Sequence, residues 1–305
     1  EELRARPGFA VRPVSAVVVS YNEKELMQAC LQAFRDTVPT GAWEFIAVDN
    51  ASTDGVNDWL REQADVKLIE NPANMGFSIG CNVGYAAAAP ENDILLINND
   101  AVLTPNALFF LRMGLYSSRD VGAVGPVSNN ASEQLADPER LHWSASMPEC
   151  FAFAETNNVE MAQPFEARAR LTGFAVLISG ECCREVAKAG VFMDPLYTPA
   201  YFEDDDLSIR IALAGFRQLL VHNAFVYHKG GLGFLRNKDA SQRSREKFLM
   251  KWGFDSWHYI GVLDECEKVI RTFLEERAAG EEGGPDRRFA GRDGTPLRML
   301  ELDCG

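Results

Sequence analysis

The first 127 residues alternate short apolar runs with longer amphipathic stretches, and this alternation limits the possible folds more than any other feature of the sequence. The apolar runs predict strands at "PVSAVVVS", "WEFIAVDN", "VKLIE", "DILLIN" and residues 121–127. The stretches between them predict helices at residues 23–34, 55–63, 78–89 and 105–117. Strands that alternate with helices predict an α/β fold with a parallel sheet. Ligands bind such sheets at the carboxyl ends of the strands, so the residues that end each strand are candidates for a binding site.

The rest of the chain is organised differently. Residues 128–165 lose the alternation and are rich in Asn, Ser, Pro and Glu, which predicts a long surface excursion. Order resumes at "ARLTGFAVLISG", followed by a helix near 181–189, a helix beginning near Asp206, a strand ending in "FVYH", and helices at 238–252 and 256–278. Residues 279–296 are rich in Gly, Arg, Glu and Asp and predict a linker, after which "PLRMLELDCG" begins a new strand.

Composition excludes several classes of protein. The net charge of -14 argues against a nucleic-acid binder, because phosphate contacts need a basic surface. The seven cysteines are scattered without a Cys-x-x-Cys pair, which favours a reducing compartment over a disulfide framework or a zinc site. We find no signal peptide and no apolar stretch of the roughly 18 residues that a membrane span needs. The chain begins with Glu, so we expect it to be a segment of a longer protein.

Polar side chains follow four of the predicted strands. The segments are Ser20-Tyr21-Asn22, Asp49 to Asp54, "NPANMGF" at 71–77, and Asn98-Asn99-Asp100. Each segment alone also fits a turn or a helix cap, where Asn, Asp, Ser and Gly are common. Because the carboxyl ends of parallel strands meet at one edge of a sheet, the convergence of all four favours a binding site.

Two of the strand-end residues suit a metal. Asp100 follows a buried strand, where a hard oxygen ligand could hold Mg²⁺ or Mn²⁺ against a diphosphate. The alternative is that Asp100 caps the helix predicted near Pro105, although Thr104 is better placed for that. His228 ends an apolar strand before a Gly-rich loop, and it is the one of the four histidines that we favour as a metal ligand.

Four acids stand in a row at Glu203 to Asp206. Asp204 or Asp205 could cap a helix beginning near Asp206, and Asp206 has the spacing for an ion pair with Arg210. Capping and the helix dipole explain two or three of the acids. They leave one carboxylate, Glu203 or Asp204, on the loop before the helix as a candidate general base.

These segments resemble the family-2 group of inverting, nucleotide-sugar-dependent glycosyltransferases with the GT-A fold, in particular the rhamnosyltransferase-like branch. The resemblance covers roughly residues 14–235. It rests on "VVVSYN", "AVDNASTDG", "NMGFSIGCNVGY", "LLINNDAV", "TGFAVLISGE", "YFEDDDLSIRIALAGF" and "FVYH" in this order. The last residues, 297–305, resemble the first motif of S-adenosylmethionine-dependent methyltransferases, which implies a second domain fused in the parent protein.

The glycosyltransferase resemblance implies a role for each candidate site residue. The residues that would bind the donor nucleotide are Ser20, Tyr21, Asn22, Asp49, Asn50, Ser52, Asn74, Gly76, Phe77, Asn82, Asn98 and Asn99. The family's Asp-x-Asp metal motif matches Asn98-Asn99-Asp100, which leaves Asp100 as its carboxylate ligand, and His228 matches a histidine that completes the metal site. The family's Glu-Asp pair matches Glu203 and Asp204, and Asp204 corresponds to the catalytic base.

The expected function is inverting sugar transfer from a UDP- or dTDP-sugar to a hydroxyl of a glycan or polysaccharide, with Mn²⁺ or Mg²⁺ as cofactor. The alternative is a nucleotide-sugar-binding module without turnover in a larger fused protein. The expected GT-A domain spans residues 1–278, with a nucleotide-binding half at 14–127, an acceptor half at 128–237 and C-terminal helices at 238–278. We expect the 128–165 excursion and the segment around Thr172-Gly173 to shape the acceptor side. The expected location is the cytoplasm, peripheral at the inner face of the membrane.

Overall fold

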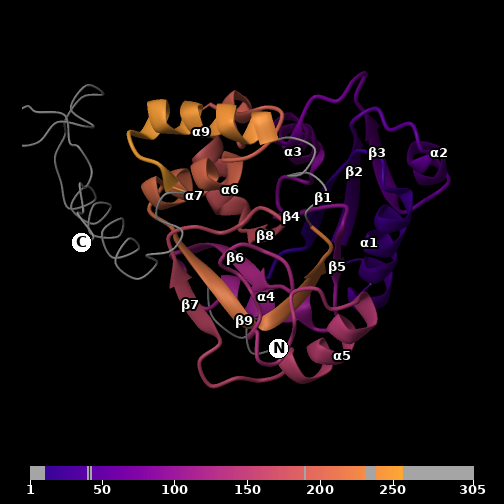
Figure 1. Cartoon of the computed structure of the whole chain (residues 1–305), viewed down its shortest axis with the longest axis vertical. Helices are drawn as coiled ribbons and strands as arrows, with labels where there is room; N and C mark the ends of the chain where they lie inside the picture. The colour runs from indigo at the N-terminus through magenta and orange to yellow at the C-terminus, as the bar shows by residue number, and fades with distance from the viewer. Residues whose placement is uncertain (1–10, 40, 42, 189, 231–237, 257–305) are drawn as a thin grey trace, which may run out of the picture.

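The computed structural model describes residues 11–39, 41, 43–188, 190–230 and 238–256, which form a mixed α/β fold (Figure 1). These residues contain one nine-stranded sheet in the order β3-β2-β1-β4-β8-β6-β9-β5, with β7 paired to β9. The strands are β1 (Val14–Ser20), β2 (Trp43–Asp49), β3 (Val66–Glu70), β4 (Asp93–Ile97), β5 (Ala101–Leu103), β6 (Val121–Val127), β7 (Phe165–Arg168), β8 (Ala175–Ile178) and β9 (Arg217–His228).

Helices cover both faces of this sheet. They are α1 (Lys24–Thr37), α2 (Val56–Arg61), α3 (Phe77–Ala87), α4 (Ala107–Leu115), α5 (Met147–Asn157), α6 (Gly180–Ala187), α7 (Glu203–Leu213) and α9 (Lys238–Trp252), with a short 3₁₀ helix η1 (Pro195–Tyr197). Alternate residues of β1 face opposite layers: Val18 packs in the same apolar cluster as α1 and α4, whereas Val17 packs with α3, α6 and α7. A strand that is buried on both faces explains the continuous apolar run that predicted it.

The predicted parallel arrangement is confirmed for β3, β2, β1 and β4, which pair in parallel. Beyond β4 the pairing is mixed: β8 lies antiparallel between β4 and β6, whereas β6 pairs in parallel with β9. β5 and β7 also pair antiparallel with β9. The sheet is therefore mixed, with β3, β2, β1 and β4 as its parallel part (Figure 1).

The region at 128–165 is more ordered than the sequence predicted. It contains α5, which begins with a capping box. The Ser146 side chain accepts a hydrogen bond from the Glu149 N–H, and the Glu149 carboxylate accepts one from the Ser146 N–H. This Ser-x-x-Glu pattern was readable from the sequence. The helix predicted at 238–252 is confirmed as α9. The predictions for 256–278, 279–296 and 297–305 fall almost entirely outside the described residues. Among the residues that the structure describes, no helix combines the length and apolar character of a membrane span.

Candidate active site

Asp100 and His228 lie together where β4 ends and β5 begins. β5 runs antiparallel to β9 with Ala101 opposite His228, which brings the preceding Asp100 beside the histidine. Asp100 Oδ1 lies 3.3 Å from His228 Nε2, and Asp100 Oδ2 accepts a hydrogen bond from the Gly230 N–H at 3.1 Å. His228 Nδ1 lies 2.5 Å from the Asn130 carbonyl oxygen, so Nδ1 donates to that carbonyl and Nε2 faces Asp100.

This pair fits a divalent cation. A histidine that donates through one nitrogen to a carbonyl and presents the other is the usual arrangement of a metal ligand. Burial raises the pKa of Asp100, but the hydrogen bond and charge of His228 and the Gly230 N–H outweigh it and hold that pKa below its usual value. The described residues contain no group of three or more His, Cys, Asp or Glu around one point. A cation at Asp100 and His228 would therefore complete its coordination with water or with diphosphate oxygens.

The alternative role of Asp100 as a helix cap is wrong. Helix α4 begins at Ala107 with Asn106 at its N-cap position. The Thr104 hydroxyl does not cap α4 either, because it donates to the Phe225 carbonyl of β9.

The acidic run forms the first turn of α7, which begins at Glu203 and not near Asp206 as predicted. Phe202 occupies the N-cap position with a φ of 70°, and no side chain caps the helix, so the predicted capping by Asp204 or Asp205 is wrong. Acids in a first turn are favourable to the helix dipole. Asp204 is the most exposed of the four. Its side chain is 16% exposed, compared with 2% for the side chain of Asp205 and 0% for that of Asp206.

The buried acids differ in their surroundings. The predicted ion pair between Asp206 and Arg210 is confirmed, with an Nε–Oδ2 distance of 2.7 Å. Burial raises the pKa of Asp205 to about 7, and the nearby charge of Arg170 opposes this while that of Asp204 adds to it. Burial, followed by the charge of Asp204, raises the pKa of Glu203 well above its usual value. The acid that remains accessible for proton transfer is therefore Asp204.

A short segment connects Asp204 to the metal pair. The Gly173 N–H donates to Asp204 Oδ2 at 2.9 Å. The ring of the next residue, Phe174, stacks on His228 with 4.9 Å between ring centroids. The Phe174 carbonyl accepts a hydrogen bond at 2.8 Å from the N–H of Asn98, two residues before Asp100. The structure thus brings the predicted base and the predicted metal ligands to one place.

The predicted nucleotide residues at the ends of β1 and β2 form a closed network. The Asn22 N–H donates to Ser52 Oγ at 2.7 Å, and Asn22 Oδ1 accepts from the Thr53 N–H at 2.8 Å. Asn99 Nδ2 donates to the Asn22 carbonyl at 3.2 Å, which joins the end of β4 to the same network. Tyr21 is 48% exposed beside it. These contacts fix the loops and leave the Tyr21 ring available to a ligand.

Two buried polar atoms at these strand ends lack a partner among the described residues. They are Ser20 Oγ and Asp49 Oδ1. The other oxygen of Asp49 accepts from the Ser52 N–H at 3.1 Å. Buried polar atoms without a hydrogen bond are costly, so such atoms at a binding edge indicate a bound ligand or water.

Hydrogen bonds around Gly76 fix the turn that precedes α3. Asn50 Nδ2 donates to the Gly76 carbonyl at 3.2 Å, and Asn74 Oδ1 accepts from the Gly76 N–H at 3.0 Å. The Phe77 N–H donates to the Pro199 carbonyl at 2.8 Å. Gly76 has a φ of 82° and would place a Cβ 2.8 Å from that carbonyl oxygen, so this close approach requires glycine.

Asn82 of α3 hydrogen-bonds to the segment before η1. Its amide donates to the Met193 carbonyl at 2.7 Å and accepts from the Met193 N–H at 2.8 Å. Both hydrogen-bonding ends of Asn82 are therefore used within the protein, where they tie α3 to the segment before η1.

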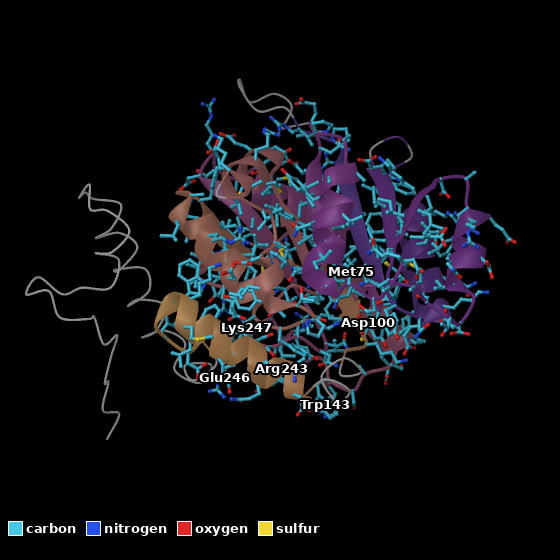
Figure 2. The ribbon with its side chains drawn as sticks, turned by 90° about the horizontal axis from the view of Figure 1, so that it is seen from above. Met75, Asp100, Trp143, Arg243, Glu246 and Lys247 are labelled. Carbon is cyan, nitrogen blue, oxygen red and sulfur yellow. The ribbon has the colours of Figure 1, made fainter. Side chains whose placement is uncertain are left out.

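Figure 2 shows the site from above. The Asp100 label stands just beneath that of Met75, which precedes α3. Trp143, in the loop before α5, lies nearer the lower edge of the view. Helix α9 supplies the labelled side chains of Arg243, Glu246 and Lys247. The Trp143 side chain is among the most exposed large apolar groups of the described residues, at 64%.

Sequence reasoning missed two groups that support the site. Asn129 and Asn130 follow β6 and hold β9: Asn129 Oδ1 accepts from the His228 N–H at 2.9 Å, and its Nδ2 donates to the His228 carbonyl at 3.0 Å. Their position at the end of a strand was a usable signal. Arg170 contacts the acids of α7 and carried no such signal, because it stands alone in "ARLTG".

Residues 15–162 match the family model "Glycosyl transferase family 2". A search of functionally curated proteins finds no match.

Solved structures resemble the whole fold. A crystal structure of GalNAc-T7 with UDP, GalNAc and Mn²⁺ is 16% identical with a TM-score of 0.62, covering 88% of this chain and 57% of that one. The mannosyltransferase PcManGT of Pyrobaculum calidifontis, in complex with GDP-Man and Mn²⁺, is 18% identical with a TM-score of 0.55, covering 93% and 81%. S. aureus TarS 1-349 is 13% identical with a TM-score of 0.51, covering 78% and 65%. The chain thus spans less than two thirds of the GalNAc-T7 and TarS chains, and what it shares with all three is the GT-A fold.

Proposed function

We propose that the chain transfers a sugar from a nucleotide-diphosphate donor to a hydroxyl of a glycan, with inversion, because residues 15–162 match the glycosyltransferase family 2 model and the fold is GT-A. One observation carries this proposal: Asp204, the most exposed acid of its run, is joined through Gly173 and Phe174 to the Asp100–His228 pair. A general base and a diphosphate site must lie on either side of the anomeric carbon in such a reaction.

The reaction that these residues support is a single displacement. The Asp204 carboxylate takes the proton of the acceptor hydroxyl as the hydroxyl oxygen forms a bond to the anomeric carbon. The bond from that carbon to the diphosphate oxygen breaks, and the nucleoside diphosphate leaves with the electron pair. Attack from the face opposite the leaving group inverts the anomeric configuration.

The other side of the site suits the donor. Asp100 and His228 would hold a divalent cation, which stabilises the charge of the departing diphosphate. Ser20 Oγ and Asp49 Oδ1 are unpartnered polar atoms that suit the nucleoside, and the exposed Tyr21 ring suits stacking on its base. The printed complexes of GalNAc-T7 with UDP and Mn²⁺ and of PcManGT with GDP-Man and Mn²⁺ support a donor and cation of this class.

The finer identity of the substrates is part of the proposal. The rhamnosyltransferase-like segments favour a UDP- or dTDP-linked hexose or deoxyhexose as donor, and a glycan or polysaccharide as acceptor. Thr172 Oγ1 donates to the Ser132 carbonyl, and the Gly173 N–H donates to Asp204 Oδ2, so the 128–165 region is connected to the proposed base; this supports an acceptor role for these loops.

A donor panel tests this function. The chain is incubated with UDP-, dTDP- and GDP-sugars, with Mn²⁺ or with a chelator, and release of the nucleoside diphosphate and the anomeric configuration of the product are measured. We expect metal-dependent release from a UDP- or dTDP-sugar and an inverted product. Donor binding without release from any sugar would instead favour the binding module, and a retained configuration would contradict the displacement.

A further inference from the structure

Arg170 is a nearly buried cation that faces three carboxylates. Its side chain is only 18% exposed, and its Nε lies 2.7 Å from Asp205 Oδ1. Its Nη1 donates to Glu133 Oε1 at 3.4 Å, and its Nη2 lies 3.9 Å from Asp204 Oδ2. The planar guanidinium presents five N–H donors in a fixed fork, whereas an ammonium group is a compact point charge.

The first turn of α7 needs such a cation. Glu203 is 8% exposed and Asp205 is 2% exposed, and a buried carboxylate without compensation is costly. Arg170 reaches this turn from the segment between β7 and β8, so it compensates the acids from outside their own helix.

The same segment continues to the metal pair. Asp204 Oδ2 lies between the Gly173 N–H at 2.9 Å and Arg170 Nη2 at 3.9 Å. Phe174 follows Gly173 and stacks on His228. A displacement of Arg170 would therefore move Asp204 relative to the metal ligands.

We propose that Arg170 is a positioning residue, which holds the Asp204 carboxylate in place beside the Asp100–His228 pair. This inference rests on the proposed function, in which Asp204 is the base. Arg170 itself touches neither the donor nor the reacting atoms in this account.

The pH dependence of transfer is a readout that a merely structural role would not move. The titratable and charged groups around this turn are Arg170, Glu133, Glu203 and Asp205, with Cys81 and Tyr201 facing Glu203. Arg170 is the cation among these groups. Its charge opposes the burial that raises the pKa of Asp205, so its removal should raise that pKa further and move the acid limb of transfer to a higher pH.

The experiment compares Arg170→Gln and Arg170→Lys with the wild-type chain in kcat, donor KM and the pH profile of kcat/KM. A matched control is Arg168→Gln, because the Arg168 side chain is 17% exposed and its ion pair is with Glu166, at 3.0 Å, and not with an acid of α7. For Arg170→Gln we expect kcat to fall about 10- to 100-fold at unchanged donor KM, with the acid limb moved up by about one pH unit. For Arg170→Lys we expect the acid limb of the pH profile to lie at the wild-type pH again, while kcat stays low.

The inference is overturned if both Arg170 variants keep kcat within about twofold of the wild type and the same acid limb. Thermal unfolding and nucleoside diphosphate affinity are measured for each variant. If Arg170→Gln does not fold, Arg170→Lys decides: reduced kcat at unchanged nucleotide affinity supports the inference, and wild-type kcat refutes it. An inactive Asp204→Asn variant beside active Arg170 variants refutes the positioning role alone, whereas an active Asp204→Asn variant refutes the proposed base.

Discussion

Replacing Asp206 with Asn should destabilise the protein by about 3–5 kcal/mol, because breaking a buried ion pair leaves cations without their counter-charge. Asp206 is 0% exposed, and its oxygens lie 2.7 Å from Arg210 Nε and 2.5 Å from Lys251 Nζ. Trp252 Nε1 also donates to this carboxylate at 2.9 Å, and the Tyr197 hydroxyl at 3.3 Å. Asn keeps the volume and can still accept hydrogen bonds, so the loss is mainly electrostatic.

Other partners of the two cations reduce this loss. Lys251 retains Asp194 at 2.7 Å, and Arg210 still donates to the carbonyls of Val191 and Phe192 at 2.9 and 2.8 Å. We therefore expect the lower end of the range, about 3 kcal/mol, which lowers the Tm of a domain of this size by about 6–12 °C.

Urea unfolding followed by tryptophan fluorescence measures this loss, with Asp120→Asn as the control. Asp120 also forms an ion pair, with Arg217 at 2.5 Å, but the two side chains are 48% and 46% exposed. An exposed pair contributes less than about 1 kcal/mol. If Asp206→Asn loses no more stability than Asp120→Asn, the Asp206 junction does not hold α9 to α7 and this reasoning is refuted.

Three further predictions concern stability and metal binding. Because the pKa of Asp205 is raised to about 7, the folded state binds the Asp205 proton more tightly than the unfolded state does. As pH rises from about 4 to 7, the wild type should therefore lose a few kcal/mol of stability relative to Asp205→Asn in urea unfolding. Parallel pH profiles of the two proteins would contradict this. Asp100→Asn and His228→Ala should each weaken Mn²⁺ binding in the presence of UDP by at least about tenfold in calorimetry, and unchanged affinity would exclude the pair as ligands. Gly84→Ala would place a Cβ 2.3 Å from Val17 Cγ1 and should cost about 1–3 kcal/mol, with partial recovery on adding Val17→Ala; no loss would show that α3 can shift on β1.

The sequence predicted the features that depend on neighbouring residues. The apolar run "SAVVVS" is buried along its whole length in β1, so its composition was enough to identify a central strand. The spacing of Asp206 and Arg210 was enough to identify their ion pair. Strand β5 was missed because three residues carry too little pattern to be recognised.

Features that depend on distant residues were not predictable. Helix α7 begins three residues earlier than expected because tertiary contacts, and not a capping side chain, fix its start at Phe202. The roles of the four acids depend on Arg170 before the helix and on Lys251 and Trp252 after it. The antiparallel insertion of β8 between β4 and β6 is likewise a long-range pairing.

The most direct test of the central claim is the single-turnover rate of sugar transfer by Asp204→Asn, measured with saturating donor and Mn²⁺. Asn preserves the size of the side chain and can still accept from the Gly173 N–H, but it cannot take the acceptor's proton. We expect a rate lower by about 10²–10⁴-fold, with nucleoside diphosphate affinity and Tm close to those of the wild type. A transfer rate within a few-fold of the wild type would contradict the assignment of Asp204 as the base.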